Sequence, residues 1–134
     1  MTTAANNAAT ETFDPAGSDS QKIDGLHTIH FSFDKSGLNQ DDKKLLDQNV
    51  TWMTQHPNTK IQIEGHCDQR GSIEYNLGLG ERRAKAAQSY MMSQGINQSR
   101  LSVISYGKEK PISTGDTDAD YAKNRRDNFV PMKN

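Results

Sequence analysis

The chain has 134 residues, a length that fits one domain, and hydrophobic residues make up only 32% of it. Its mean hydropathy of -0.90 is low for a globular chain, so we expect a thin core and some disordered sequence. Lys and Arg (16) almost balance Asp and Glu (17), which leaves a formal net charge of -1 at pH 7. This balance excludes a global basic field that would attract nucleic acid or an anionic membrane, so any charged ligand must be recognised locally.

The first 21 residues differ from the rest of the chain in composition. Residues 1–21 are rich in Ala, Thr, Asn, Asp and Ser, and their only large apolar side chains are Met1 and Phe13. We therefore expect a flexible tail over residues 1–21 and a single domain over residues 22–134. No apolar run is long enough to span a bilayer, and no export signal precedes the tail. Cys67 is the only cysteine, which excludes an intrachain disulfide.

The first predicted elements are a strand and a helix. Apolar and polar residues alternate over residues 28–33, a pattern typical of a strand. Asn39 is a suitable N-cap for a helix whose apolar stripe runs from Leu45 to Met53 and which ends before Pro57.

The second half of the chain alternates strands with helical patterns in the same way. Strands are predicted over residues 60–66, 101–105 and 128–132. A longer helix is expected from residue 76 to a C-terminal cap at Gly95, and a short helical turn over residues 119–124. The predicted order β-α-β-α-β-(α)-β defines an α/β fold with some parallel strand pairing and helices covering the sheet.

Two opposite charges stand where the second strand and the longer helix converge. Asp68 follows the strand, and Arg83 lies in the helix after a polar loop that contains glycine. Asp68 can accept from a ligand ammonium, while Arg83 can hold a ligand carboxylate with its two-pronged donor geometry. The pair could therefore bind a zwitterion, although a simple salt bridge between the two side chains explains them equally well at this stage.

Other chemistry-bearing residues favour structural interpretations. His66, Cys67 and Asp68 are adjacent, but neighbouring strand residues point to opposite faces, so they do not converge simply. The histidines show no spacing that predicts a metal site. Arg125 and Arg126 are expected to pair with carboxylates and brace the last strand rather than to bind phosphate.

Four sequence blocks resemble the OmpA-like peptidoglycan-binding domain family, and within it the lipoproteins of the Tol–Pal system of Gram-negative bacteria. The blocks are IHFSFDKSGL, GHCDQRGSIEYNLGLGERRA, SRLSVISYGKEKP and AKNRRDNFV, which stand in the family's order over residues 29–130. The resemblance implies an OmpA-like arrangement of helices on one mixed sheet.

The resemblance also implies a ligand, the peptidoglycan stem peptide and particularly its meso-diaminopimelate. The side-chain end of this amino acid carries both an ammonium and a carboxylate, the zwitterion for which Asp68 and Arg83 are suited. The family's binding residues correspond to Phe33, Asp34, Asp68, Ser72, Asn76, Leu79 and Arg83. The resemblance implies neither a catalytic residue, nor a metal, nor a cofactor.

At the level of the cell, the resemblance implies a location on the periplasmic face of the outer membrane. The domain would be held there by an N-terminal lipid anchor that this chain does not contain, with TolB and other Tol proteins as further partners. Two alternatives remain open. One is a cell-wall hydrolase that uses the cluster of His66, Cys67 and Asp68, and the other is a structural envelope module in which Asp68 and Arg83 only brace the fold.

Overall fold

The computed structural model describes residues 12–132, which form a four-stranded sheet, three α-helices and two short 3-10 helices. In chain order the elements are η1 (Gly17–Ser20), β1 (Ile29–His30), α2 (Gln40–Gln55), β2 (Lys60–His66), α3 (Ile73–Ser93), η2 (Gln98–Arg100), β3 (Leu101–Gly107), α4 (Asp118–Asn124) and β4 (Arg126–Met132).

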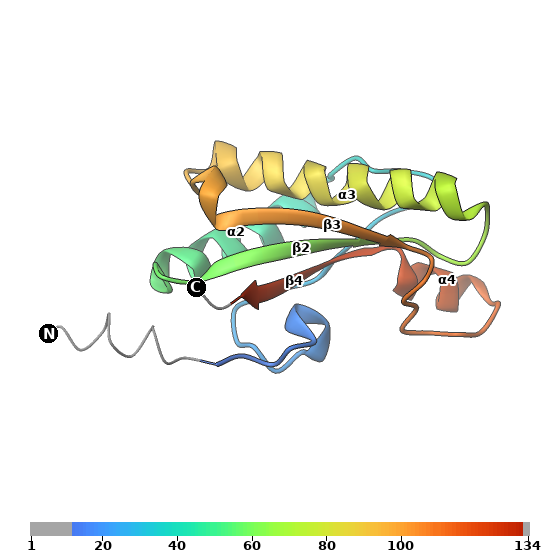
Figure 1. Ribbon diagram of the computed structural model, residues 1–134, viewed down its shortest axis with the longest axis horizontal. Helices are drawn as coiled ribbons and strands as arrows, with labels where there is room; N and C mark the ends of the chain where they lie inside the picture. Colours follow the sequence, from blue (N-terminus) through green and yellow to red (C-terminus); the bar gives the residue numbers. More distant parts are fainter. Residues whose placement is uncertain (1–11, 133–134) are drawn as a thin grey trace, which may run out of the picture.

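The sheet is mixed, with the strand order β1-β4-β2-β3. Strands β2 and β3 are parallel, whereas β4 runs antiparallel to both β1 and β2. Helices α2 and α3 lie on one face of this sheet, η1 lies on the other side, and α4 sits at one end (Figure 1). The predicted α/β fold, with its helices on one mixed sheet, is confirmed. Over residues 12–132, no helix has both the length and the apolar character that a membrane span requires.

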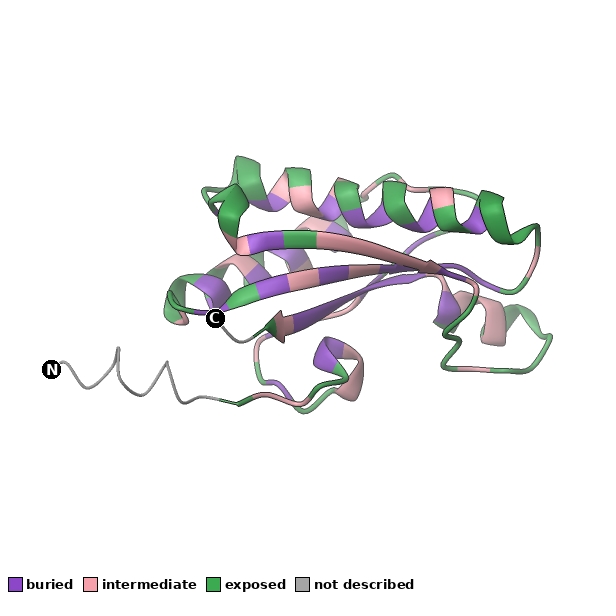
Figure 2. Cartoon of the chain, viewed as in Figure 1, coloured by how far each residue is buried: buried purple, intermediate pink, exposed green. Residues whose placement is uncertain are grey.

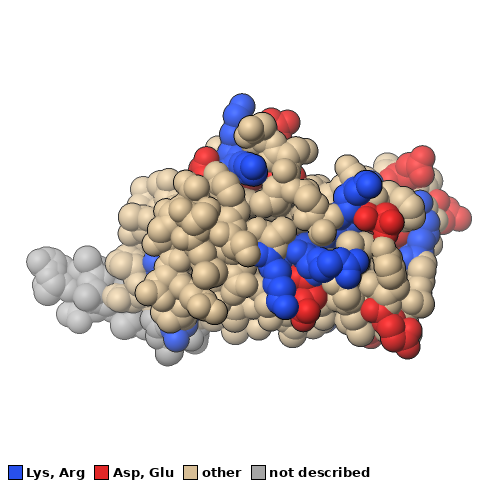
Figure 3. All heavy atoms as spheres, turned by 90° about the horizontal axis from the view of Figure 1, so that it is seen from above, with Lys and Arg blue, Asp and Glu red and all other residues tan. Residues whose placement is uncertain are grey.

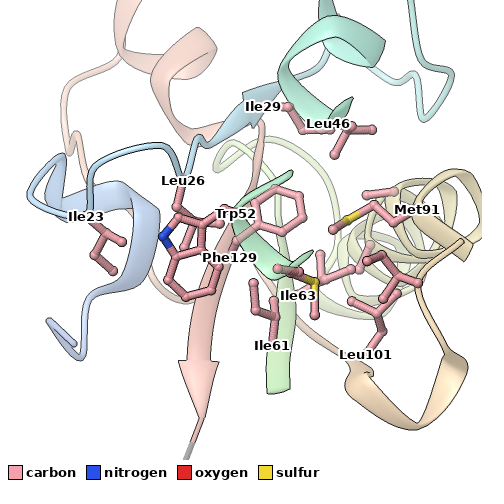
Figure 4. Packing of buried hydrophobic residues seen from close by; sticks show 14 of the residues in the cluster. Ile23, Leu26, Ile29, Leu46, Trp52, Ile61, Ile63, Met91, Leu101 and Phe129 are labelled. Carbon is pink, nitrogen blue, oxygen red and sulfur yellow. The ribbon is translucent and has the colours of Figure 1, made fainter. Parts of the chain in front are cut away.

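The core lies between the helices and the sheet. Leu46 and Met53 of α2, Ile63 of β2, Met91 of α3 and Phe129 of β4 are completely buried in it (Figure 4). Along α3 the buried positions face the sheet and the exposed ones face outward (Figure 2). This is the pattern expected of an amphipathic helix that covers a sheet.

Strand β1 is shorter than the strand predicted over residues 28–33. His30 pairs with Arg126, the first residue of β4, so the ladder has no partner strand beyond this point. The chain instead turns, with the Lys35 amide donating to the Ser32 carbonyl, and Asp34 adopts a positive φ of 59°. As a result Phe33 and Asp34 leave the sheet and lie in a loop.

Helix α3 begins earlier than the predicted residue 76. The Ser72 hydroxyl accepts a hydrogen bond from the Tyr75 amide, and this N-cap starts the helix at Ile73. The N-cap predicted for α2 is confirmed, because Asn39 and Asp42 form a reciprocal capping box.

The residues that precede β1 require a correction to the predicted tail over residues 1–21. Part of the tail lies outside the described residues, but η1 is held on the sheet by polar contacts. Asp19 forms an ion pair of 2.8 Å with Arg126, and the Ser18 hydroxyl donates to the Asn128 side chain. Phe13 packs edge-on against Trp52. Composition alone missed this segment because polar contacts, rather than apolar burial, attach most of it.

Candidate functional site

A recess of about 100 Å³ opens where β2 ends, between the loop after β1, the loop over residues 67–72 and the first turns of α3. It is lined by Phe33, Asp34, Cys67, Asp68, Arg70, Gly71, Tyr75, Asn76, Leu79 and Arg83. All the predicted site residues except Ser72 line this recess. Ser72 is exposed, and its hydroxyl caps α3.

Asp68 is the acidic group of the recess, and its carboxylate is only 3% exposed. Its Oδ1 accepts from the backbone amide and from Nε of Arg70, both at 3.0 Å, and its Oδ2 accepts from Nη2 of Arg70 at 2.7 Å. Nη1 of Arg125 also donates to Oδ2, at 3.4 Å. Burial alone would raise the pKa of Asp68, but these donors outweigh it and the pKa is lowered, so Asp68 is an anion at neutral pH.

Arg70 also lines the recess, although it is not among the residues predicted from the sequence. Its guanidinium lies between two aromatic rings, 4.0 Å from the centroid of Phe33 and 4.2 Å from that of Tyr121. Cation–π contacts of this kind hold a guanidinium plane in a fixed orientation. The sequence held one signal for Arg70, its position two residues after Asp68 at the end of a strand. Its aromatic partner Tyr121 lies too far along the sequence to be recognised from a local pattern.

Arg83 does not pair with Asp68, so the simple salt bridge considered for these two residues is wrong. Its side chain is 1% exposed and donates to three backbone carbonyls, those of Lys35, His66 and Ser32. Burial lowers the pKa of its guanidinium, although an arginine stays charged in proteins. Each terminal nitrogen uses one of its two N–H groups in these bonds, so the other N–H group on each takes no part in them.

Asp34 and Tyr75 meet at the mouth of the recess. The Tyr75 hydroxyl donates to Oδ1 of Asp34, and this hydrogen bond raises the pKa of Tyr75. Phe33 beside them is 55% exposed, which is unusual for a phenylalanine. The loop after β1 therefore presents an apolar ring and a carboxylate side by side.

Asn76 and Leu79 form the α3 side of the recess, and both are buried. The Asn76 amide donates to the carbonyls of Arg70 and Ser72, which fixes the loop that carries Asp68. Leu79 supplies an apolar part of the recess wall.

The neighbours of Asp68 do not form a catalytic arrangement. The Cys67 thiol donates to the Asn76 carbonyl, and burial raises the pKa of this thiol, which opposes formation of the nucleophilic thiolate. His66 interacts through Nε2 with Glu64 instead, while its Nδ1 has no hydrogen-bond partner among the described residues. Residues 12–132 also contain no cluster of His, Cys, Asp or Glu that could hold a metal ion.

Arg125 and Arg126, at the start of the last strand, pair with carboxylates, as the sequence predicted. Arg126 binds Asp19, and Arg125 donates to Asp68 and to the Phe31 carbonyl. On the face seen in Figure 3, acidic and basic side chains lie next to one another, and neither sign covers that face. This face therefore presents no broad field of one sign, and a charged ligand must be recognised by local groups such as those of the recess.

The fold and the recess define a small α/β binding domain whose site combines buried carboxylate and guanidinium groups with an apolar wall. The family model described as "OmpA family" matches residues 30–125. The chain belongs to the OmpA family. This membership identifies a non-enzymatic domain.

Several known proteins are similar to this chain in sequence. The chain is 44% identical over 98 residues to the peptidoglycan-associated lipoprotein of Rhizobium meliloti, a match covering 73% of this chain and 56% of the relative. It is 38% identical over 124 residues to the peptidoglycan-associated lipoprotein of Haemophilus influenzae, which covers 92% and 80% of the two chains. The match to the first relative thus spans little more than half of that protein's length.

Among solved structures, the fold is similar to the crystal structure of the peptidoglycan-associated lipoprotein from Burkholderia pseudomallei. The TM-score is 0.75 at 35% sequence identity, with 78% of this chain and 89% of the other covered.

Proposed function

We propose that this domain binds peptidoglycan non-covalently and that it does so through the meso-diaminopimelate of the stem peptide. The observation that carries the proposal is the recess, in which Asp68 and Arg83 stand as a buried anion and a buried cation without neutralising each other. The names of the relatives, peptidoglycan-associated lipoprotein, support the same ligand.

Within this proposal the groups of the ligand have separate partners. The ammonium of diaminopimelate binds the Asp68 carboxylate, and its carboxylate takes the N–H groups of Arg83 that the backbone carbonyls leave unused. The methylene chain packs on Leu79, while Phe33 and Asp34 contact the ligand at the mouth. Ser72 and Asn76 hold the loop and the helix start that shape the recess.

We extend the proposal to the cell envelope on the strength of the lipoprotein relatives. The domain tethers the outer membrane to the cell wall from its periplasmic face, as part of a Tol–Pal system with TolB and other Tol proteins as partners. A lipidated N-terminus would provide the membrane attachment.

Co-sedimentation with purified peptidoglycan tests the ligand. Asp68→Asn keeps the size of the side chain but removes its charge, so wall binding should weaken by about 2–5 kcal/mol, the usual effect of leaving one charge of a desolvated pair without its partner. Asp24→Asn is the matched control, because Asp24 is exposed and does not line the recess. If folded Asp68→Asn sediments as the wild type does, the structural-module alternative replaces this proposal.

The hydrolase alternative is tested on the same material. A binding domain leaves a peptidoglycan suspension turbid, whereas a hydrolase clears it. Clearing that is lost in Cys67→Ser would contradict the proposal.

A further inference from the structure

The carboxylate of Asp68 is already saturated by donors of the protein itself. A carboxylate offers about four acceptor positions, two on each oxygen. Arg70 fills three of them through its amide, Nε and Nη2, and Arg125 takes the fourth through Nη1. A ligand ammonium therefore finds no acceptor on Asp68 unless one of these donors leaves.

The position of the recess determines which donor can leave. Asp68 and Arg70 both line the recess, whereas Arg125 does not. The side chain of Arg70 is 37% exposed and that of Arg125 only 15%, and Arg125 is also bound to the Phe31 carbonyl. A ligand that enters the recess thus meets the Arg70 guanidinium first, and this guanidinium can move toward solvent.

We propose that Arg70 is an internal cation that occupies the ammonium position of the recess, and that a ligand ammonium must displace its guanidinium from Asp68 to bind. This inference rests on the proposed function and adds a specificity-determining residue to it. The exchange replaces one cation with another, so the buried carboxylate stays neutralised before and after binding. A ligand without an ammonium cannot complete the exchange, because its binding would leave the buried Asp68 with only the longer 3.4 Å contact of Arg125 as a cationic partner.

The rings of Phe33 and Tyr121 give the displaced guanidinium a place to remain. They contact it from both sides, and cation–π contacts do not depend on the hydrogen bonds to Asp68. The side chain therefore stays at the mouth of the recess, ready to return when the ligand dissociates.

Nuclear magnetic resonance of the wild-type protein tests the displacement directly. The probe is the tripeptide L-Ala-γ-D-Glu-meso-diaminopimelate, and the signal is the Nε–H resonance of Arg70, assigned by its absence in Arg70→Gln. We expect this resonance to shift and to exchange faster with solvent on saturation, because its bond to Asp68 is lost. The Nε–H of Arg125, which donates to the Phe31 carbonyl, should stay in place as an internal control. An Arg70 resonance that is unchanged at saturation overturns the inference.

A second test compares two neutralised arginines. Arg70→Gln should bind the tripeptide about fivefold more tightly than the wild type, because breaking a partly exposed ion pair no longer opposes binding. Arg82→Gln is the matched control, since Arg82 is exposed and does not line the recess. If Arg70→Gln binds the tripeptide more weakly than the wild type or equally well, this inference is overturned, whereas the proposed function still stands. If the wild type neither binds the tripeptide nor sediments with the wall, the proposed function fails and this inference fails with it.

Discussion

Gly80 of α3 lies so close to Gly65 of β2 that a Cβ atom on Gly65 would stand 1.8 Å from the carbonyl oxygen of Gly80. This approach sets the helix directly on the strand. Arg83 lies about one turn further along α3, and its Nη1 reaches the carbonyl of His66, the residue after Gly65, at 2.9 Å. The two glycines thus help to determine where the guanidinium of the recess stands.

Gly65→Ala should destabilise the domain by at least about 1–3 kcal/mol, because the added methyl group meets backbone that cannot move without displacing α3. Urea unfolding measures the change. Gly37→Ala is the control, since a Cβ atom at Gly37 meets nothing within 4 Å. Equal stabilities of the two variants would show that the helix adjusts easily and that this contact does not fix its position.

The proposed role of Arg83 predicts a choice between ligands. Lysine lacks the carboxylate that diaminopimelate carries at the end of its side chain, so a lysine stem peptide should bind more weakly by about 1.5–3 kcal/mol. Arg83→Lys should lose most of this preference, because an ammonium cannot reproduce the two-pronged contact. Calorimetric titration with both peptides gives the answer, and equal wild-type affinities would refute the assignment of Arg83 to the carboxylate.

Arg83→Ala should lower the stability of the domain as well as its affinity for the ligand. Its guanidinium binds carbonyls in the loop after β1 and at the end of β2, and these acceptors would lose their donors. We expect the free energy of unfolding to fall by about 2–5 kcal/mol, as measured by urea denaturation. A fully stable Arg83→Ala variant would show that the loops are held by other contacts.

The N-terminal segment should contribute to stability through its ion pair. Asp19 and Arg126 are largely buried, so Asp19→Asn leaves an arginine without its partner and should destabilise the domain by about 3–5 kcal/mol. Thermal and urea unfolding of the full chain test this. A chain that starts at residue 22 should be less stable than a chain that starts at residue 12, and the difference in the free energy of unfolding should be at least as large as the effect of Asp19→Asn. Equal stability of these two chains would mean that η1 adds nothing to the fold.

Asp127 should make the domain less stable as the pH rises. Burial raises its pKa well above the ordinary range; Arg83 opposes this shift and Asp42 adds to it. Neither carboxyl oxygen has a hydrogen-bond partner among the described residues. The folded state therefore keeps a proton that the unfolded state releases above about pH 4, so stability is lost from there up to the raised pKa.

Asp127→Asn should remove this loss of stability. The variant should gain stability over the wild type at pH 7 and gain little or nothing below about pH 4, where both states of the wild type hold the proton. Urea unfolding across this range measures the difference, with Asp24→Asn as the control. A constant difference at all pH values would show that the Asp127 carboxyl does not titrate with folding.

Local sequence patterns predicted the type and order of the main elements, because side-chain periodicity and capping residues act over a few neighbouring positions. Asn39 indicated the start of α2, and the alternation over residues 60–66 indicated β2. The four family blocks also placed the site at the end of β2, where the recess lies. The end of β1 escaped prediction, because it depends on where β4 begins rather than on the local pattern.

Which groups face each other within the recess depends on the tertiary structure. Two of the three carbonyl partners of Arg83, those of Ser32 and Lys35, lie 51 and 48 positions before it, and Arg125, which contacts Asp68, lies 57 positions after Asp68. Such pairs form only when the sheet and α3 bring distant loops together, so no local pattern records them. The salt bridge that the sequence left open between Asp68 and Arg83 does not form, because a side chain two residues away, that of Arg70, reaches the carboxylate while the helix directs Arg83 toward backbone carbonyls.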